Sequence, residues 1–206
     1  MRHLRLYLRS LALGCLFALA AGSVLAGAAA AQGASGKWSY FQFKPGQYLK
    51  YDMKSARGIQ GWLSLKVDDG GKGVLNVTVA GKWTKDFSET AKLKPGQSAF
   101  DLAYAFKDIE ITNAASSLLD VDSAVVENTV WKDGFTWAKG DQSILVKGEK
   151  ECAGVKGLLA VYSSKSFGRV QKKTFGVNTG LPLPIFVEVP AANDTWTYTL
   201  VEKKGF

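Results

Sequence analysis

Histidine and cysteine are scarce in this chain, whose 206 residues include one histidine and two cysteines. The histidine is His3 and the first cysteine is Cys15, so beyond the N-terminal segment only the thiol of Cys152 remains. The rest of the chain therefore has no imidazole for a Ser-His-Asp or Cys-His arrangement, or for a histidine-liganded zinc ion. It also has no Ser-x-x-Lys motif, the common histidine-free arrangement for acyl transfer.

A lone cysteine beyond the N-terminal segment cannot form an internal disulfide, so packing has to hold the fold together. We interpret Cys152 as a buried small apolar residue, which is the usual environment of a free cysteine. Its neighbours Lys150 and Glu151 have opposite charges and give no reason for a lowered thiol pKa. Pairing of Cys152 with a second chain is the alternative interpretation.

Residues 1–31 have the three parts of a secretory signal peptide. A positive segment comes first, an apolar run over residues 11–21 follows, and Ala29-Ala30-Ala31 fits the small-residue cleavage site. The positive segment contains Arg2, Arg5 and Arg9. We therefore expect export to the periplasm or the extracellular space, with no transmembrane helix left after cleavage.

Two alternatives to a cleaved signal peptide fit this segment less well. An uncleaved membrane anchor would need about 20 apolar residues, and this run is shorter. Lipidation at Cys15 is suggested by the preceding Leu-Gly, but few apolar residues separate Arg9 from this site.

Arginine is also scarce after residue 31, where only Arg57 and Arg169 remain and lysine supplies the other positive charges. Recognition of phosphates and bases by forked hydrogen bonds prefers arginine. The lysines are spread along the chain, which is typical of a solvated β surface that resists aggregation. Nucleic acid is therefore not an expected partner, whereas contact with anionic lipid head groups stays open.

The remaining chain predicts a flexible lead over residues 32–36 and one β-rich domain over residues 37–206. The best hairpin spans residues 61–83, because apolar residues alternate on both sides of the Gly-rich turn 69–73. Other extended runs are 38–43, 48–53, 100–106, 143–147, 154–163, 172–177, 185–189 and 195–203. Pro182 and Pro184 predict that residues 181–184 are an edge or crossing segment.

One helix is predicted, over Asn113–Asn128, because Asn113 can cap it and its apolar residues follow helical spacing. The apolar stripe includes Leu118, Val121 and Val125. The fold class is therefore mainly β, with a single curved antiparallel sheet or half-barrel and one covering α-helix.

The aromatic residues Trp131, Phe135 and Trp137 surround the turn dipeptide Asp133-Gly134. They fit either a cross-strand cluster that stabilises a hairpin or an exposed surface for sugar or lipid. Together with Leu118, Val121 and Val125 they form the candidate hydrophobic-ligand or contact surface.

The order of these elements resembles that of the periplasmic lipoprotein-localisation carriers and related lipid-binding half-barrels. A signal peptide is followed by the early hairpin 62–83, the helix 113–128, the Gly-Leu-Pro-Leu-Pro-Ile block 180–185 and a closing strand over 196–202. The resemblance implies that acyl chains, free or on a lipoprotein, bind inside an incomplete barrel.

We therefore expect a non-catalytic envelope protein that binds a hydrophobic ligand and needs no cofactor or metal. A structural or protein-interaction component of the cell envelope is the alternative, and a carboxylate-based hydrolase is the third hypothesis. A connected apolar hollow of roughly 300 Å³ or more would favour the carrier, and a filled core would favour the interaction protein.

The signal-peptide interpretation predicts that the protein recovered from its host begins at Gln32. Intact-mass spectrometry of the exported protein checks this. A mass that includes residues 1–31, or a lipid attached at Cys15, would contradict the predicted cleavage.

Overall fold

The computed structural model describes residues 36–166, 169–191 and 194–206. The predicted signal peptide, including His3 and Cys15, and residues 32–35 of the predicted lead lie outside the described residues. Residues Gly33–Phe206 belong to one compact unit. None of the described helices has the length and hydropathy that crossing a membrane would require.

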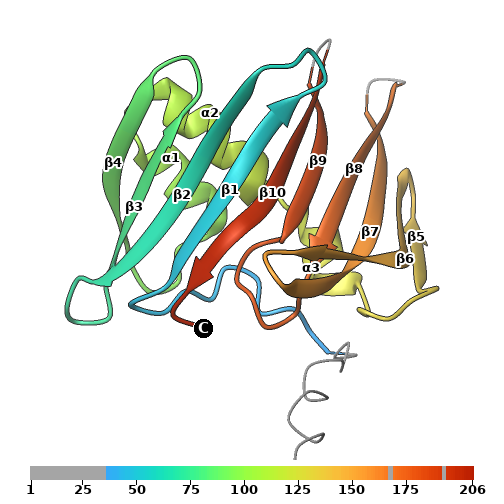
Figure 1. The fold of residues 1–206 in the computed structure, drawn as a ribbon. Coiled ribbons are helices and arrows are strands. Elements are labelled where there is room, and N and C mark those ends of the chain that lie inside the picture. Colours follow the sequence, from blue (N-terminus) through green and yellow to red (C-terminus); the bar gives the residue numbers. More distant parts are fainter. Residues whose placement is uncertain (1–35, 167–168, 192–193) are drawn as a thin grey trace, which may run out of the picture. The chain divides into compact units, whose positions relative to one another are not determined.

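Ten strands form one open antiparallel sheet (Figure 1). In the order of the sheet they are β4 (Asp86–Leu93), β3 (Leu75–Lys82), β2 (Gln60–Asp69), β1 (Tyr48–Ser55), β10 (Asp194–Lys204), β9 (Phe186–Ala191), β8 (Arg169–Val177), β7 (Val155–Ser166), β6 (Gln142–Cys152) and β5 (Thr136–Lys139). The predicted mainly β fold with a curved antiparallel sheet is confirmed. The predicted hairpin and the C-terminal strands are confirmed with it, whereas β4 and β5 were not predicted.

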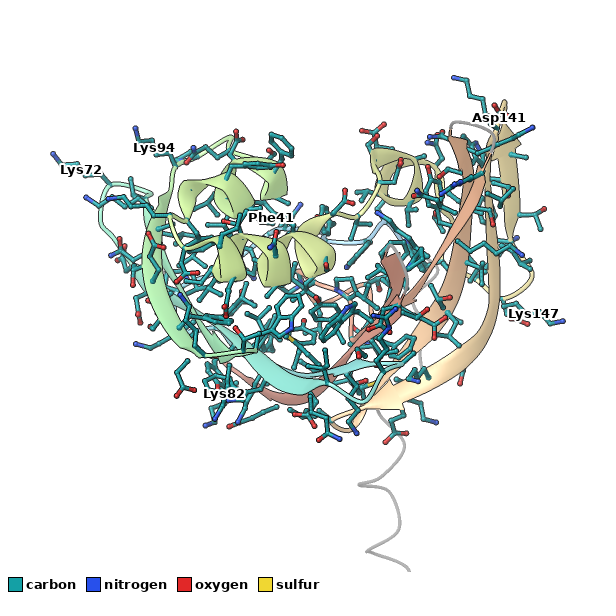
Figure 2. The ribbon with its side chains drawn as sticks, turned by 90° about the horizontal axis from the view of Figure 1, so that it is seen from above. Phe41, Lys72, Lys82, Lys94, Asp141 and Lys147 are labelled. Carbon is teal, nitrogen blue, oxygen red and sulfur yellow. The ribbon has the colours of Figure 1, made fainter. Side chains whose placement is uncertain are left out.

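Neighbouring strands are also consecutive in the sequence, except where β1 pairs with β10 at the centre. The two edge strands, β4 and β5, are consecutive in the chain but lie at opposite edges of the sheet. Residues 94–135 therefore have to run from one edge to the other. They do so across the concave face, where Figure 2 shows the helices within the curve of the sheet.

The concave face is apolar because every second residue of the strands points to it. Tyr51, Leu63, Val79 and Tyr198 are fully buried there, and the core continues into the helices. Lysines and threonines alternate with them toward solvent, as expected for a sheet with one buried face. A bulge in the β1–β10 pairing at Lys50/Tyr51 adds to the bending of the sheet.

Three helices occupy the crossing segment, in place of the single predicted helix. They are α1 (Ala99–Ala105), α2 (Ile109–Leu119) and α3 (Ser123–Asn128). Each has a side-chain N-cap: Ser98 in a capping box with Asp101, then Asp108 and Asp122. These caps explain why the predicted helix 113–128 begins earlier and breaks at residues 120–122.

The predicted strand over 100–106 is wrong, because these residues form α1. Leu102, Ala103 and Phe106 face the core, while Phe100 and Tyr104 face outward at helical spacing. Residues 106–108 separate α1 from α2.

The prediction of a strand over residues 38–43 is also wrong. These residues have an irregular backbone and pack against the proline-containing segment 181–184. The indole Nε1 of Trp38 donates to the carbonyl of Leu181 at 2.7 Å, and the Phe41 amide donates to Pro182. The prediction for residues 181–184 is confirmed, since they lie outside the ladder. They are buried, and the Pro184 carbonyl accepts a hydrogen bond from the Tyr51 hydroxyl at 3.0 Å.

Two leucines on strands of the sheet provide a matched test of the core. Leu63 in β2 is 0% exposed and Leu145 in β6 is 40% exposed. We expect Leu63→Ala to lower the free energy of unfolding by about 2–5 kcal/mol, because the cavity it leaves cannot fully close. Leu145→Ala should cost less than about 1 kcal/mol. Urea unfolding compares the two, and equal losses would contradict the assignment of the concave face as core.

Candidate functional site

A half-open groove of about 690 Å³ lies on the concave side, between the helices and one end of strands β8 and β9. Its lining includes Phe100, Ala103 and Tyr104 of α1, Ser116, Ser117 and Leu119 of α2, Ser123, Val126 and Glu127 of α3, and Lys173, Val189 and Pro190 of the sheet. Tyr40, Asp120 and Val121 complete the central part of the lining. The groove therefore has a mixed lining, in which four serines and three charged side chains lie among apolar and aromatic residues.

The groove reaches the sheet because β8 and β9 separate. They pair only where Thr174–Gly176 face Phe186–Glu188, and Figure 1 shows them diverging beyond that point. Lys173 on β8 and Val189 on β9 are the first residues past the pairing. Pro190, which follows, has no N–H to donate to a neighbouring strand. The interrupted ladder leaves these three residues free to line the groove.

A pair of exposed aromatic rings forms one wall. Phe100 and Tyr104 are 68% and 65% exposed, and their ring centroids lie 4.4 Å apart at a 41° tilt. The two residues are one turn apart on α1, so the helix itself places the rings side by side. The capping box at Ser98, whose hydroxyl accepts from the Asp101 amide at 3.2 Å, sets the start of α1. The two rings together expose an unusual amount of aromatic surface beside the groove.

Three polar contacts hold the linker between α2 and α3 against the rest of the domain. Lys173 Nζ lies 2.6 Å from Asp120 Oδ2, and the Tyr162 hydroxyl donates to Asp122 Oδ2 at 2.6 Å. The Tyr40 hydroxyl donates to the Leu119 carbonyl. These contacts fix the position of the groove's central wall.

The tyrosines near the groove are held in their neutral form. Burial raises the pKa of Tyr198 to about 12, a shift that the Ser117 side chain partly offsets. Burial and the contact with Asp122 together raise the pKa of Tyr162 to about 12. Burial also raises the pKa of Tyr40. All three hydroxyls therefore stay protonated around neutral pH.

The predicted surface residues separate into different environments. Leu118, Val125 and Trp131 are almost completely buried in the core, and only Val121 lines the groove. Phe135 and Trp137 are half-buried against the core near the β5 edge. Trp131 packs edge-on against Trp38, with centroids 5.6 Å apart. Cys152 is buried as predicted, and burial raises the pKa of its thiol.

Sequence reasoning missed the groove residues Phe100, Tyr104, Ser117, Lys173 and Val189. The sequence contained a signal for the helix that places the aromatic pair, because Ser98 and Asp101 have the spacing of a capping box. Lys173 had no such signal, since it occurs in the ordinary pair Lys172-Lys173.

The acidic groups that the structure describes in the groove do not form a cluster. Among the described residues, no group of three or more histidine, cysteine or acidic side chains could hold a metal ion. The carboxylate of Asp120 is paired with Lys173, and Glu127 is exposed on α3.

No protein-family model matches the chain, and no curated protein is significantly similar to it.

The buried tyrosines predict a loss of stability at alkaline pH. A tyrosine in the unfolded chain ionises near pH 10, whereas Tyr162 and Tyr198 have pKa values of about 12 in the folded protein. Their stabilising contribution is therefore complete below about pH 10 and is lost as the pH rises toward about 12. Urea unfolding over this pH range measures the loss.

Tyr198→Phe should make that alkaline loss of stability shallower, because the variant has one fewer buried hydroxyl to ionise. Tyr104→Phe changes an exposed ring and serves as the matched control, with the pH dependence of the unmodified protein. Identical curves for Tyr198→Phe and the unmodified protein would contradict this assignment.

Proposed function

We propose that this protein is exported and binds a hydrophobic ligand, an acyl chain that is free or attached to a lipoprotein, and that it does so without catalysis. The observation that carries the proposal is the groove of about 690 Å³ with the exposed Phe100–Tyr104 pair as one wall. Its volume lies within the range of about 300–1,000 Å³ that is typical of small-molecule sites.

The state of the core supports a binding groove over a defect in packing. Leu118 of α2 and Val125 of α3 are 0% exposed, and Val121 is 8% exposed at the groove wall. The groove therefore lies beside side chains that are themselves buried in the core. Covering a large apolar side chain contributes about 1.5–3 kcal/mol, so a ligand that covers both rings gains substantial affinity from them alone.

Two carboxyl groups of the helical segment, those of Asp101 and Asp108, are not suited to act as the general acid of a hydrolase. A glycoside hydrolase needs one carboxyl with a raised pKa as its general acid. Backbone and side-chain hydrogen bonds from Ser98 lower the pKa of Asp101, and contacts with the Glu110 amide and Lys85 lower that of Asp108. These groups act as helix caps.

A protein-interaction role is the second candidate, because the exposed rings could also receive an apolar side chain of an envelope protein. The two functions differ in what occupies the groove. A carrier binds an isolated alkyl chain, whereas an interaction surface of this kind needs the rest of the partner for affinity.

Native mass spectrometry of the protein, gently purified from its host, is the direct test of occupancy. We expect co-purified lipid or, after its removal, stoichiometric binding of dodecanol. A protein that carries no lipid and does not bind dodecanol would contradict the carrier proposal.

Two valine variants locate the binding. Val126 is half-buried and lines the groove, whereas Val130 is 45% exposed and does not line it. Val126→Trp should fill part of the groove and weaken dodecanol binding about tenfold or more, while Val130→Trp should leave it nearly unchanged. Equal affinities of the two variants would place the binding elsewhere, and circular dichroism confirms that both are folded.

A further inference from the structure

We propose that the groove selects amphiphiles with an anionic head, a carboxylate or a phosphate, and that Lys173 is the residue that binds the head. This inference rests on the proposed function, since it concerns the ligand of the same groove. It is carried by the position of Lys173 and by the unequal burial of the two partners in its ion pair.

Lys173 points toward the inside of the sheet. In the β7–β8 pairing it faces Tyr162, and Phe175 two residues on is fully buried on the same face. The side chain of Lys173 is 20% exposed, and among the described residues that line the groove it is the only basic one. Val189 and Pro190 belong to the same lining, so the groove contains apolar side chains as well as this ammonium group.

Asp120, the partner of Lys173, is much more exposed to solvent. Asp120 lies 2.6 Å from the ammonium nitrogen, yet its side chain is 67% exposed. An anionic head that displaces Asp120 therefore returns a carboxylate to water, where its hydration is nearly complete, and keeps the buried ammonium group paired. Such an exchange has a low desolvation penalty.

A cationic head would have the opposite consequence. It could pair with Asp120 only by leaving the less exposed ammonium group of Lys173 without its anion. Pairing with Glu127 would contribute little, because that carboxylate is exposed to solvent. Leaving a partly buried charge without a partner is unfavourable. The difference in burial thus gives the groove a preference for anions, although Asp120 and Glu127 outnumber Lys173 in its lining.

Hydroxyl groups in the same lining suit the oxygen atoms of an anionic head. Ser116 comes from the last turns of α2, and Ser123 is the first residue of α3. Serine hydroxyls donate hydrogen bonds to carboxylate and phosphate oxygens alike. The alkyl chain would then contact the Phe100–Tyr104 pair, which provides aromatic surface in the same lining.

Four compounds with the same alkyl chain test the inference: dodecanoate, dodecyl phosphate, dodecanol and dodecylamine. Their dissociation constants are measured by calorimetry at neutral pH, at concentrations below the critical micelle concentration of each compound. The protein is purified from its host. We expect one or both anions to bind about tenfold more tightly than dodecanol, the ratio typical of one added charge-assisted hydrogen bond. Dodecylamine should bind more weakly than dodecanol. The ratio of the two anions tells carboxylate from phosphate.

Variants assign the preference to Lys173. Lys173→Gln should remove the advantage of the anions while changing dodecanol affinity by less than about twofold. Lys172→Gln is the matched control, because Lys172 is exposed on the opposite face of the same strand and should change nothing. Asp120→Asn should strengthen binding of the anions, since it removes their competitor for Lys173, and it keeps the test available if Lys173→Gln does not fold.

The outcomes separate this inference from the proposed function. Binding of dodecanol without a preference for anions, or a preference that survives Lys173→Gln, would overturn the role of Lys173 and leave the carrier function standing. Failure of all four compounds to bind would refute the carrier function and the inference together.

Discussion

An open sheet with one apolar face has to have that face covered, and this constraint determines the rest of the structure. The edge strands β4 and β5 are consecutive in the chain but lie at opposite edges of the sheet. The segment that joins them therefore crosses the concave face and supplies the cover. The N-terminal layer around Trp38 and the buried segment 181–185 cover the part that the helices do not reach.

The cover is incomplete at one place, where two irregularities meet. The helical segment breaks between α2 and α3, and β8 separates from β9 on the facing part of the sheet. Asp120 from the break and Lys173 from the separated strand form an ion pair there. Breaks in regular structure commonly occur at functional sites, because they expose polar groups that a continuous ladder or helix would occupy.

The sheet could be predicted largely from the sequence, since alternation of apolar residues has a direct physical cause when one face of a strand is buried. Strands β4 and β5 were not predicted, and for β4 the structure shows why. Strand β4 has Glu89 at an inward position, where its carboxylate accepts hydrogen bonds from the amides of Lys107 and Asp108 at 2.9 and 3.2 Å. Glu89 contacts the start of α2 and stands where an apolar residue would complete the alternation. The sequence of β4 therefore lacks a regular apolar pattern.

The helices and the groove were harder to predict for different reasons. The apolar residues of 100–106 fit both a two-residue and a helical period, and only the capping box at Ser98 decides between them. The groove is assembled from the N-terminal layer, three helices and two strands that are distant in the sequence. Its members, such as Lys173 and Val189, have no local pattern that sets them apart. Pairing of β8 with β9 has to be known before they can be placed together.

The most direct measurement of the central claim is a methyl and aromatic NMR titration of the protein with dodecanol. The account predicts chemical-shift changes concentrated on Leu119, Val121, Val126 and Val189 and on the rings of Phe100 and Tyr104. Residues on the outer face of the sheet, such as Leu145 and Val201, should not respond. Shift changes confined to that outer face, or none at saturating dodecanol, would contradict a ligand-binding groove.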